Sequence, residues 1–267
     1  MLAEVERDVL RIALNHQTNA ALRWERMIIR ELQSPLPPSV ALPRVNVLWL
    51  LQGQFLHDIE AAYPMTDSVI NKVHWCDKGA AISLASDGQV CVEFLSRVWS
   101  PLELREATKT SWKCMYDVWR PPTHKMIDFT SSENWLSMQF YRMLLFKGQE
   151  IRLCVSTVIQ RFVEVNREVR VWRSMVTVGT VGIGEWEGIF ADETGWSICT
   201  RSEIGGTSSQ ICTRITPVSL IPKHPKLEDF IYLLGGMSDS DFSLIDEAIE
   251  SATLDKSVTV LSSAAVV

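Results

Sequence analysis

The sequence lacks the residue spacings by which proteins bind structural metals. Its six cysteines are far apart, and no two of them form a Cys-x-x-Cys pair. The five histidines are scattered, and the only close pair of metal-ligating residues is His74 with Cys76. Zinc and iron–sulfur sites combine several such ligands, and one close pair without a second is usually a coincidence. We therefore predict no metal site and no cofactor.

Long apolar runs are also missing. The longest, VNVLWLL at 45–51, is far shorter than the roughly 20 residues of a membrane-spanning helix. The N-terminal residues MLAEVERDVL are charged and do not contain the apolar core of a secretory signal. We therefore predict a soluble cytoplasmic protein without a transmembrane segment, whose cysteines stay reduced as is usual inside cells. The nucleus is the alternative location.

The chain has fewer basic than acidic side chains. The 267 residues carry a formal net charge of −6, whereas proteins that neutralise many phosphates are usually basic over at least one domain. We therefore do not expect nucleic acid as a partner. Hydrophobic residues make up 46% of the chain and the mean hydropathy is +0.06, so the chain can bury a sizeable core.

The common catalytic motifs are absent as well. The sequence contains no G-x-S-x-G elbow, P-loop or HExxH motif. The glycines of TVGTVGIGEW at 177–186 do not join a strand to a helix, so they fit a strand connection better than a dinucleotide site. Asp192 and Glu193 are adjacent carboxylates, which are commonly solvated at the edge of a hairpin. We predict that the protein is not an enzyme and has no catalytic residues.

The predicted domain organisation has four parts. Residues 1–33 show apolar residues near the helical spacing and fit one helix, which could be the remnant of a coiled coil. Residues 34–44 contain four prolines and fit a stiff linker, although their PxxP spacing is also that of an SH3 ligand. Residues 45–255 form the main domain, and 256–267 a flexible tail.

Within the main domain, helices and strands are predicted to be segregated along the chain. Val45–Ala62 is predicted as a helix, and a short helix follows Thr66. Asp87-Gly88 marks a hairpin, and the capping box at Ser100–Glu103 begins a helix that ends near Tyr116. A meander of about five or six strands follows, and an amphipathic C-terminal helix at 241–254 completes an α+β fold. Its apolar side carries Phe242, Ile245, Ile249 and Leu254.

The stretch VIQRFVEVNREVRVWR at 158–173 places four arginines among β-prone apolar residues. If residues 166–167 form a two-residue hairpin turn, the pairing of the two strands follows by counting. The arginines then divide between the turn and the two faces of the sheet. The predicted pairs on one face are Phe162 with Val171, Val158 with Met175, and Gln160 with Arg173.

The other predicted face carries Arg161 opposite Trp172 and Arg170 opposite Val163. The simplest interpretation is that Arg161 and Arg170 lie on a face exposed to solvent and that one of them stacks on Trp172. Arg173 lies instead on a mainly apolar face and needs a partner, because an unpaired buried charge is costly. Either Gln160 or an acidic residue pairs with it, or it anchors the polar part of a ligand in an apolar cavity.

Three segments of the sequence are similar to a known family. They are RFVEVNREVRVW at 161–172, DETGWSICTRSE at 192–203 and QICTRITPV at 210–218. In this order and spacing they resemble the START-like proteins known as mating-specific in oomycetes, over about residues 45–255. Those proteins carry a basic, leucine-zipper-like helix before the START-like domain. No basic region precedes the helix at 1–33, so a DNA-binding role is not expected.

The resemblance implies a START-like helix-grip fold. In this fold a curved antiparallel sheet wraps around a C-terminal amphipathic helix, and an apolar tunnel between them binds a sterol, phospholipid or other hydrophobic ligand. It gives Arg173 a place inside the tunnel and adds lining residues on the last two strands. The predicted ligand-binding residues are Gln160, Phe162, Val171, Arg173, Trp196 and Arg214.

Three functions are consistent with the sequence. The first is a module that binds a hydrophobic small molecule, a lipid or sterol. The second is a regulatory or interaction protein, transcription-regulator-like, in which the ten tryptophans and nine phenylalanines fill the core. The helix at 1–33 would then bind a protein partner or a second copy of the chain. The third is an enzyme built on the same scaffold. The first is the predicted function and the second its alternative.

Overall fold

The computed structural model describes the chain in segments that begin at Val47. The predicted helix at 1–33, the linker at 34–44 and the tail at 256–267 lie outside the described residues, as do the turn at Asp87-Gly88 and most of the predicted helix at 241–254. The described residues are 47–72, 78–84, 90–118, 124–178, 185–186, 188–221, 224–235, 237, 247 and 250–251.

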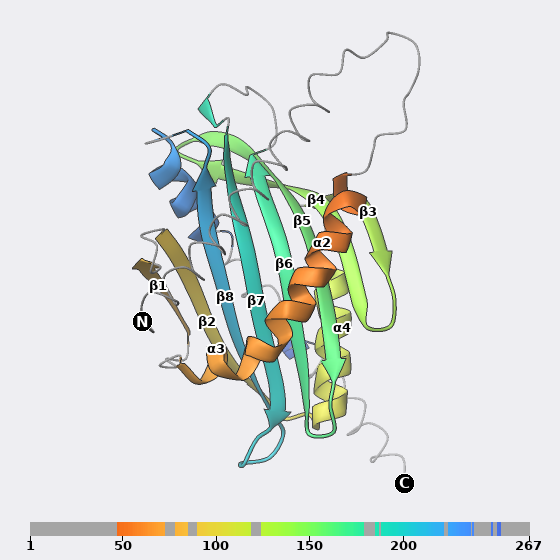
Figure 1. The fold of residues 1–267 in the computed structure, drawn as a ribbon. Helices are drawn as coiled ribbons and strands as arrows, with labels where there is room; N and C mark the ends of the chain where they lie inside the picture. Colours follow the sequence, from red (N-terminus) through yellow and green to blue (C-terminus); the bar gives the residue numbers. More distant parts are fainter. Residues whose placement is uncertain are drawn as a thin grey trace, which may run out of the picture. The chain divides into compact units, whose positions relative to one another are not determined.

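The strands form one curved antiparallel sheet of eight strands (Figure 1). The strand order is β1-β2-β8-β7-β6-β5-β4-β3, so β3 to β8 form a meander and β8 pairs with the early hairpin β1-β2. The predicted α+β class is confirmed. The strands are β1 (Lys78–Leu84), β2 (Val90–Ser100), β3 (His124–Ser131), β4 (Trp135–Phe146), β5 (Gln149–Val163), β6 (Arg167–Val178), β7 (Ile189–Arg201) and β8 (Thr207–Ser219).

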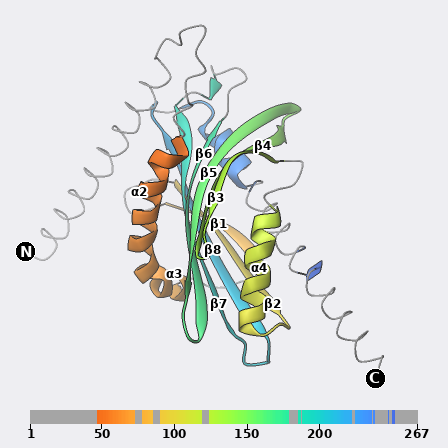
Figure 2. The ribbon, with the colours of Figure 1, turned by 90° about the vertical axis from the view of Figure 1, so that its right-hand side faces the viewer.

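Helices cover both faces of this sheet. The elements are α2 (Val47–Ala62), the 3-10 turn η1 (Tyr63–Met65), α3 (Thr66–Lys72) and α4 (Leu104–Val118), and residues 227–235 are also helical. Figure 2 shows α2 on one side of the sheet and α4 on the other. None of the described helices is both long and apolar enough to span a membrane.

The α2 face of the sheet is the side that carries Val158, Val171 and Trp196. Phe55 and Ile59 point from α2 into this side and are 5% and 0% exposed, and Val158 and Val171 are fully buried. Phe55 and Ile59 are four residues apart and therefore share one side of the helix. The helix predicted at Val45–Ala62 and the short one after Thr66 are both confirmed.

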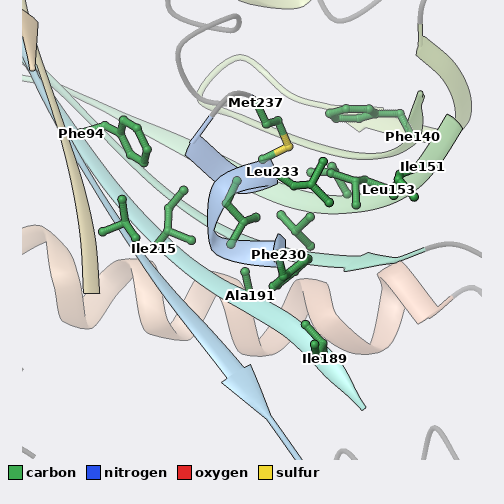
Figure 3. Close-up of a cluster of buried hydrophobic side chains, with 14 of the residues drawn as sticks. Phe94, Phe140, Ile151, Leu153, Ile189, Ala191, Ile215, Phe230, Leu233 and Met237 are labelled. Atoms are coloured by element: carbon green, nitrogen blue, oxygen red, sulfur yellow. The ribbon is translucent and has the colours of Figure 1, made fainter. Parts of the chain in front are cut away.

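The core face is the opposite side of the sheet and carries Val92, Leu153 and Ile215. The helical segment 227–235 and Met237 pack onto it, and Phe230 and Leu234 are fully buried there. Figure 3 shows this segment on one side of the sheet and α2 on the other. Burying each such side chain contributes about 1.5–3 kcal/mol. The curved sheet thus packs around a helix, as the predicted fold requires. This helix is formed by residues 227–235, which precede the predicted helix at 241–254.

Lys147 and Gly148 form the turn between β4 and β5. Lys147 and Gly148 have φ values of 49° and 78°, as a two-residue hairpin turn with both central residues left-handed requires. Glycine adopts this conformation without a steric cost. Phe146 and Gln149 pair directly on either side of the turn.

The predicted capping box at Ser100–Glu103 is wrong. Ser100 is the last residue of β2, and its Oγ accepts a hydrogen bond from the Leu102 amide at 3.3 Å. The helix begins at Leu104, where the Glu103 carbonyl accepts the first bond, from the Ala107 amide at 2.8 Å. Pairing of Ser100 in the sheet removes it from the helix and shifts the start by three residues.

Candidate functional site

All six predicted ligand-binding residues lie on the α2 face. Alternation along β5 and β6 puts Gln160, Phe162, Val171 and Arg173 on the same side as Val158. Phe162 stacks on Tyr63 with ring centroids 3.9 Å apart. The structure brings the predicted residues to one side of the sheet. That side is not the one gripped by residues 227–235.

Two of these residues belong to contacts near α2 and β2. Trp196 donates a hydrogen bond from Nε1 to the Ala62 carbonyl at 3.1 Å, which ties β7 to the end of α2. Arg214 pairs with Glu93 on the neighbouring strand at 2.6 Å, and its guanidinium lies 5.6 Å from the Trp196 ring centroid. These contacts account for Trp196 and Arg214 as parts of the packing between strands and helix.

Arg173 is held by carboxylates rather than by Gln160. Its Nη2 lies 2.6 Å from Asp192 and its Nε 3.6 Å from Asp58 on α2. The Thr194 hydroxyl also accepts a hydrogen bond from Nη1. The side chain is 16% exposed, so these partners offset most of the cost of burying the charge. Of the two interpretations of Arg173, pairing with acidic residues is the one that the contacts support.

The predicted register of β5 and β6 is wrong by two residues. Gln160 pairs with Val171, and Arg173 pairs with Val158. β5 ends at Val163 and β6 begins at Arg167, so the connection contains three residues, 164–166, and the innermost strand pair is Val163 with Glu168. A shift of two residues keeps every side chain on its face, so the division of the arginines between the two faces was predicted correctly.

Of the two arginines on the second face, Arg161 is half-buried and Arg170 is buried. Arg161 and Arg170 are directly opposite each other, and both guanidiniums lie over Trp112 of α4, at 5.2 Å and 5.6 Å from its ring centroid. Arg170 is only 3% exposed. The predicted stacking on Trp172 is replaced by stacking on Trp112, because α4 packs on this part of the core face.

A buried ion pair lies on the part of the core face that α4 covers. Arg170 donates from Nε and Nη2 to one carboxylate oxygen of Glu168, at 2.8 Å and 2.6 Å. Its Nη2 also donates to the Thr108 carbonyl of α4 at 2.7 Å. Both charged side chains are at most 6% exposed. The pair therefore anchors α4 to the sheet through a fixed set of hydrogen bonds.

Trp172 and Glu193 form the next polar contact along the core face. Trp172 donates from Nε1 to Glu193 Oε1 at 2.7 Å. Beside them, the Ser174 hydroxyl donates to Thr157 Oγ1 at 2.8 Å, and both residues are buried. Polar side chains thus continue from α4 to the middle of the sheet, next to the apolar cluster under residues 227–235.

We call this set the polar band of the core face. Its members lie on β2 and β5 to β8, their side chains share one face by strand alternation, and all but Trp172 and Glu193 are at most 8% exposed. Most of them have partners within the sheet or α4. The band consists of Ser96, Thr157, Glu168, Arg170, Trp172, Ser174, Glu193, Ser197 and Thr213.

Two hydroxyls of the polar band, those of Ser96 and Thr213, differ from the rest in their hydrogen bonding. Ser96 is 1% exposed and Thr213 is 3% exposed. Within the part of the chain that the structure describes, neither Ser96 Oγ nor Thr213 Oγ1 has a hydrogen-bond partner. Buried hydroxyls in proteins usually have a partner, so these two need an explanation.

Charged groups also gather at the connection of β5 to β6. Arg167 pairs with Asp67 of α3 at 2.5 Å and with Glu164 at 2.8 Å, and the Tyr63 hydroxyl donates to Glu164 at 2.8 Å. The Arg167 hydrogen bond holds the pKa of Glu164 below its usual value. The hydrogen bond to Glu164 raises the pKa of Tyr63. This network fastens α3 to the hairpin tip.

The thiols of Cys154 and Cys212 are poor nucleophiles. Burial raises the pKa of Cys154 to about 11 and that of Cys212 to about 12. Such thiols stay protonated at neutral pH, and the thiolate is the reactive form. Among the described residues, no group of three or more His, Cys, Asp or Glu side chains could hold a metal ion.

The sequence carried one usable signal for the polar band. Glu168 and Arg170 are two residues apart on a strand and must share a face. Two opposite charges in that relation can form a buried pair. What the sequence could not supply was the helix that covers them, because α4 lies about fifty residues earlier in the chain.

Comparison with known proteins gives structural neighbours only. No family model and no curated protein sequence matches the chain. Human StAR-related lipid transfer protein 5 is 9% identical, with a TM-score of 0.36, over 72% of this chain and 98% of that chain. Ara h 8.0201 is 11% identical, with a TM-score of 0.34, over 60% and 99%. The Zhui aromatase/cyclase from Streptomyces sp. R1128 is 12% identical, with a TM-score of 0.35, over 61% and 92%.

These neighbours have START-like helix-grip folds. Their TM-scores are below 0.5, so the fold class of this chain rests on its own strand order and on the placement of its helices. The neighbours include lipid-transfer proteins and aromatase/cyclases, and they therefore do not decide between a binding protein and an enzyme.

Proposed function

We propose that the protein binds a hydrophobic small molecule, a lipid or sterol, at the core face of its sheet. The ligand lies between the sheet, α4 and the helical segment 227–235. The proposal agrees with the resemblance of the sequence to START-like proteins. It moves the binding side from the six residues predicted on the α2 face to the face gripped by the helix.

The observation that carries the proposal is the division of the core face into two kinds of surface. Under 227–235 the face is mostly apolar, with Leu153, Val176 and Ala191 at 0% exposed, and the buried charged residue beside Leu153 is Arg142, which donates to the Met237 carbonyl at 3.4 Å. Toward α4 it becomes the polar band. Sites for hydrophobic ligands are mostly apolar and contain a few placed polar groups that fix the orientation of the ligand. A core that only stabilised the fold would gain little from burying so many polar side chains.

The proposed role is binding rather than catalysis. The charged members of the band that are most buried, Glu168 and Arg170, neutralise each other and contact α4. They are therefore engaged in structure. An acid or base for catalysis needs a proton-transfer group within reach of a substrate, and we assign that role to no residue.

Native mass spectrometry of the purified full-length chain, followed by organic extraction and lipid analysis, tests the proposal. A lipid or sterol that co-purifies at one molecule per chain supports it. A bare mass that stays unchanged after incubation with a mixed lipid extract overturns it and favours the regulatory alternative with a filled core.

Hydrogen exchange locates the ligand. With a bound lipid, the amides of 227–235 and of α4 should exchange more slowly than in the delipidated protein, and those of α2 should not change. Protection of α2 alone would place the ligand on the other face of the sheet and would contradict the proposed location.

A further inference from the structure

The two hydroxyls without partners lie close together on the core face. Thr213 is the direct cross-strand neighbour of Phe94, and Ser96 is two residues from Phe94 on the same strand. Ser96 and Thr213 are therefore diagonal neighbours on adjacent strands and share a face, a relation within reach of one small group. Figure 3 shows Phe94 and Ile215, which flank them, on the side of the helical segment that carries Phe230.

Leaving these hydroxyls buried and unpaired is unfavourable. An unsatisfied buried donor or acceptor costs free energy that a hydrogen-bonding partner would recover. A third hydroxyl, that of Ser137, is 0% exposed and also without a partner among the described residues, but strand alternation places it on the α2 face. Of these three hydroxyls, Ser96 and Thr213 lie together and border the apolar part of the core face.

We infer that Ser96 and Thr213 bind the polar head of the ligand, and that this head is uncharged. This inference rests on the proposed function. A hydroxyl can both donate and accept a hydrogen bond, so the pair suits a head that does the same, such as an alcohol or a carbonyl.

The charges around the pair exclude an anionic head. Glu193 is the cross-strand neighbour of Ile215, two residues from Thr213, and its carboxylate lies on the same face. Arg170 is in the same cross-sheet row as Ser96, but its guanidinium is already bound to Glu168 and Thr108. An anion at Ser96 and Thr213 would therefore have a carboxylate nearby, whereas Arg170, the described cation in this row of the sheet, is already paired. Like charges at short range are unfavourable.

The ligand class follows from these contacts. It is a neutral amphiphile with a large apolar body, which occupies the apolar half of the core face, and a single hydroxyl or carbonyl head at Ser96 and Thr213. Long-chain alcohols and sterol alcohols have this chemistry. Fatty acids, sterol sulfates and phospholipids with anionic heads do not.

The test compares lipids that share a hydrocarbon part and differ in the head. The probes are oleyl alcohol against oleic acid, and cholesterol against cholesterol sulfate, with binding to the delipidated full-length chain measured by native mass spectrometry at neutral pH. The neutral member of at least one pair should bind ten times more tightly or better than its anionic counterpart.

Three variants assign that preference to the two hydroxyls. Ser96→Ala and Thr213→Val should each weaken binding of the neutral lipid by about two- to tenfold, the usual effect of one hydrogen bond. Ser137→Ala removes an equally buried, unpaired hydroxyl on the other face and should bind like the parent. Because each change removes an unsatisfied group, all three variants should keep at least the thermal stability of the parent without ligand.

The outcomes separate the inference from the proposed function. If lipids bind but the neutral and anionic members of each pair bind equally, or Ser96→Ala and Thr213→Val bind like Ser137→Ala, the inference fails and the proposed function stands. If none of the four lipids binds and no lipid co-purifies with the chain, the proposed function fails and the inference fails with it.

Discussion

Trp172 lies directly across Gly195, its cross-strand partner on β7. A Cβ placed on Gly195 would come within 1.9 Å of the Trp172 ring. The absence of a side chain at Gly195 therefore lets the indole lie flat on the sheet, where its Nε1 reaches Glu193. One glycine in the middle of a strand thus fixes the position of the largest side chain in the polar band.

Gly195→Ala is expected to destabilise the protein by about 1–3 kcal/mol, the usual cost of overpacking a core. The free energy of unfolding from urea denaturation measures it. Gly53→Ala is the matched control, because nothing lies within 4 Å of the added Cβ in α2. That change should stabilise the protein by about 0.5–1 kcal/mol, since glycine is unfavourable inside helices. Equal stability of Gly195→Ala and the parent would mean that Trp172 does not lie on Gly195.

Strand alternation made the faces of the sheet predictable, but not what covers them. The predicted assignment of the β5 and β6 side chains to the two faces was correct although the predicted register was wrong by two residues. Side chains along a strand alternate with a period of two, so a shift of two residues keeps each on its face. Whether a side is buried by a helix, and by which one, depends on segments far away in the chain. Arg170 was predicted to be solvated and is buried, because α4 lies over it.

The six ligand-binding residues predicted from the sequence lie on the side of the sheet opposite the proposed site, for a related reason. Phe162 and Val171 are apolar, and an apolar face next to an arginine resembles a ligand cavity. In the structure α2 covers that face, and Arg173 pairs with Asp58 of this helix. Serine and threonine are mostly exposed in folded proteins, so nothing in the sequence indicated that Ser96 and Thr213 are buried.

The Glu168–Arg170 pair should behave as a unit in unfolding experiments. Glu168→Leu leaves the buried Arg170 without its carboxylate and should cost about 3–5 kcal/mol, and Arg170→Met should cost a similar amount. The double variant should cost clearly less than the sum, because no charge then remains unpaired. Urea denaturation of the four proteins measures the coupling. Additive effects would show that the two side chains do not depend on each other.

The hairpin tip between β5 and β6 should make stability depend on pH. The pKa of Glu164 is lowered in the folded protein, chiefly by the hydrogen bond from Arg167. The ionised carboxylate therefore stabilises the fold above its ordinary pKa of 4.5, and this contribution is lost as the pH falls through the lower value of the folded state. The urea midpoint should fall between pH 6 and pH 3.

Glu164→Gln should reduce that fall, because an amide does not titrate. Arg167→Met should reduce it as well, since it removes the group that lowers the pKa. Tyr63→Phe removes only the second hydrogen bond to Glu164 and keeps the pair with Arg167. It should therefore retain most of the pH dependence. An unchanged midpoint curve in Glu164→Gln would show that other carboxyl groups cause the loss at low pH.

Arg173→Met tests whether the α2 face of the sheet contributes to lipid binding or only to stability. Arg173 is 16% exposed and contacts Asp192 and Asp58, so its loss leaves two carboxylates without their partner. We expect a loss of about 1–3 kcal/mol in the free energy of unfolding. Because Arg173 lies on the α2 face, the amount of co-purified lipid per folded chain should not change. Native mass spectrometry and urea denaturation of the same preparations measure both quantities. Lipid loss at unchanged stability would instead return Arg173 to the ligand site and move that site to the face under α2.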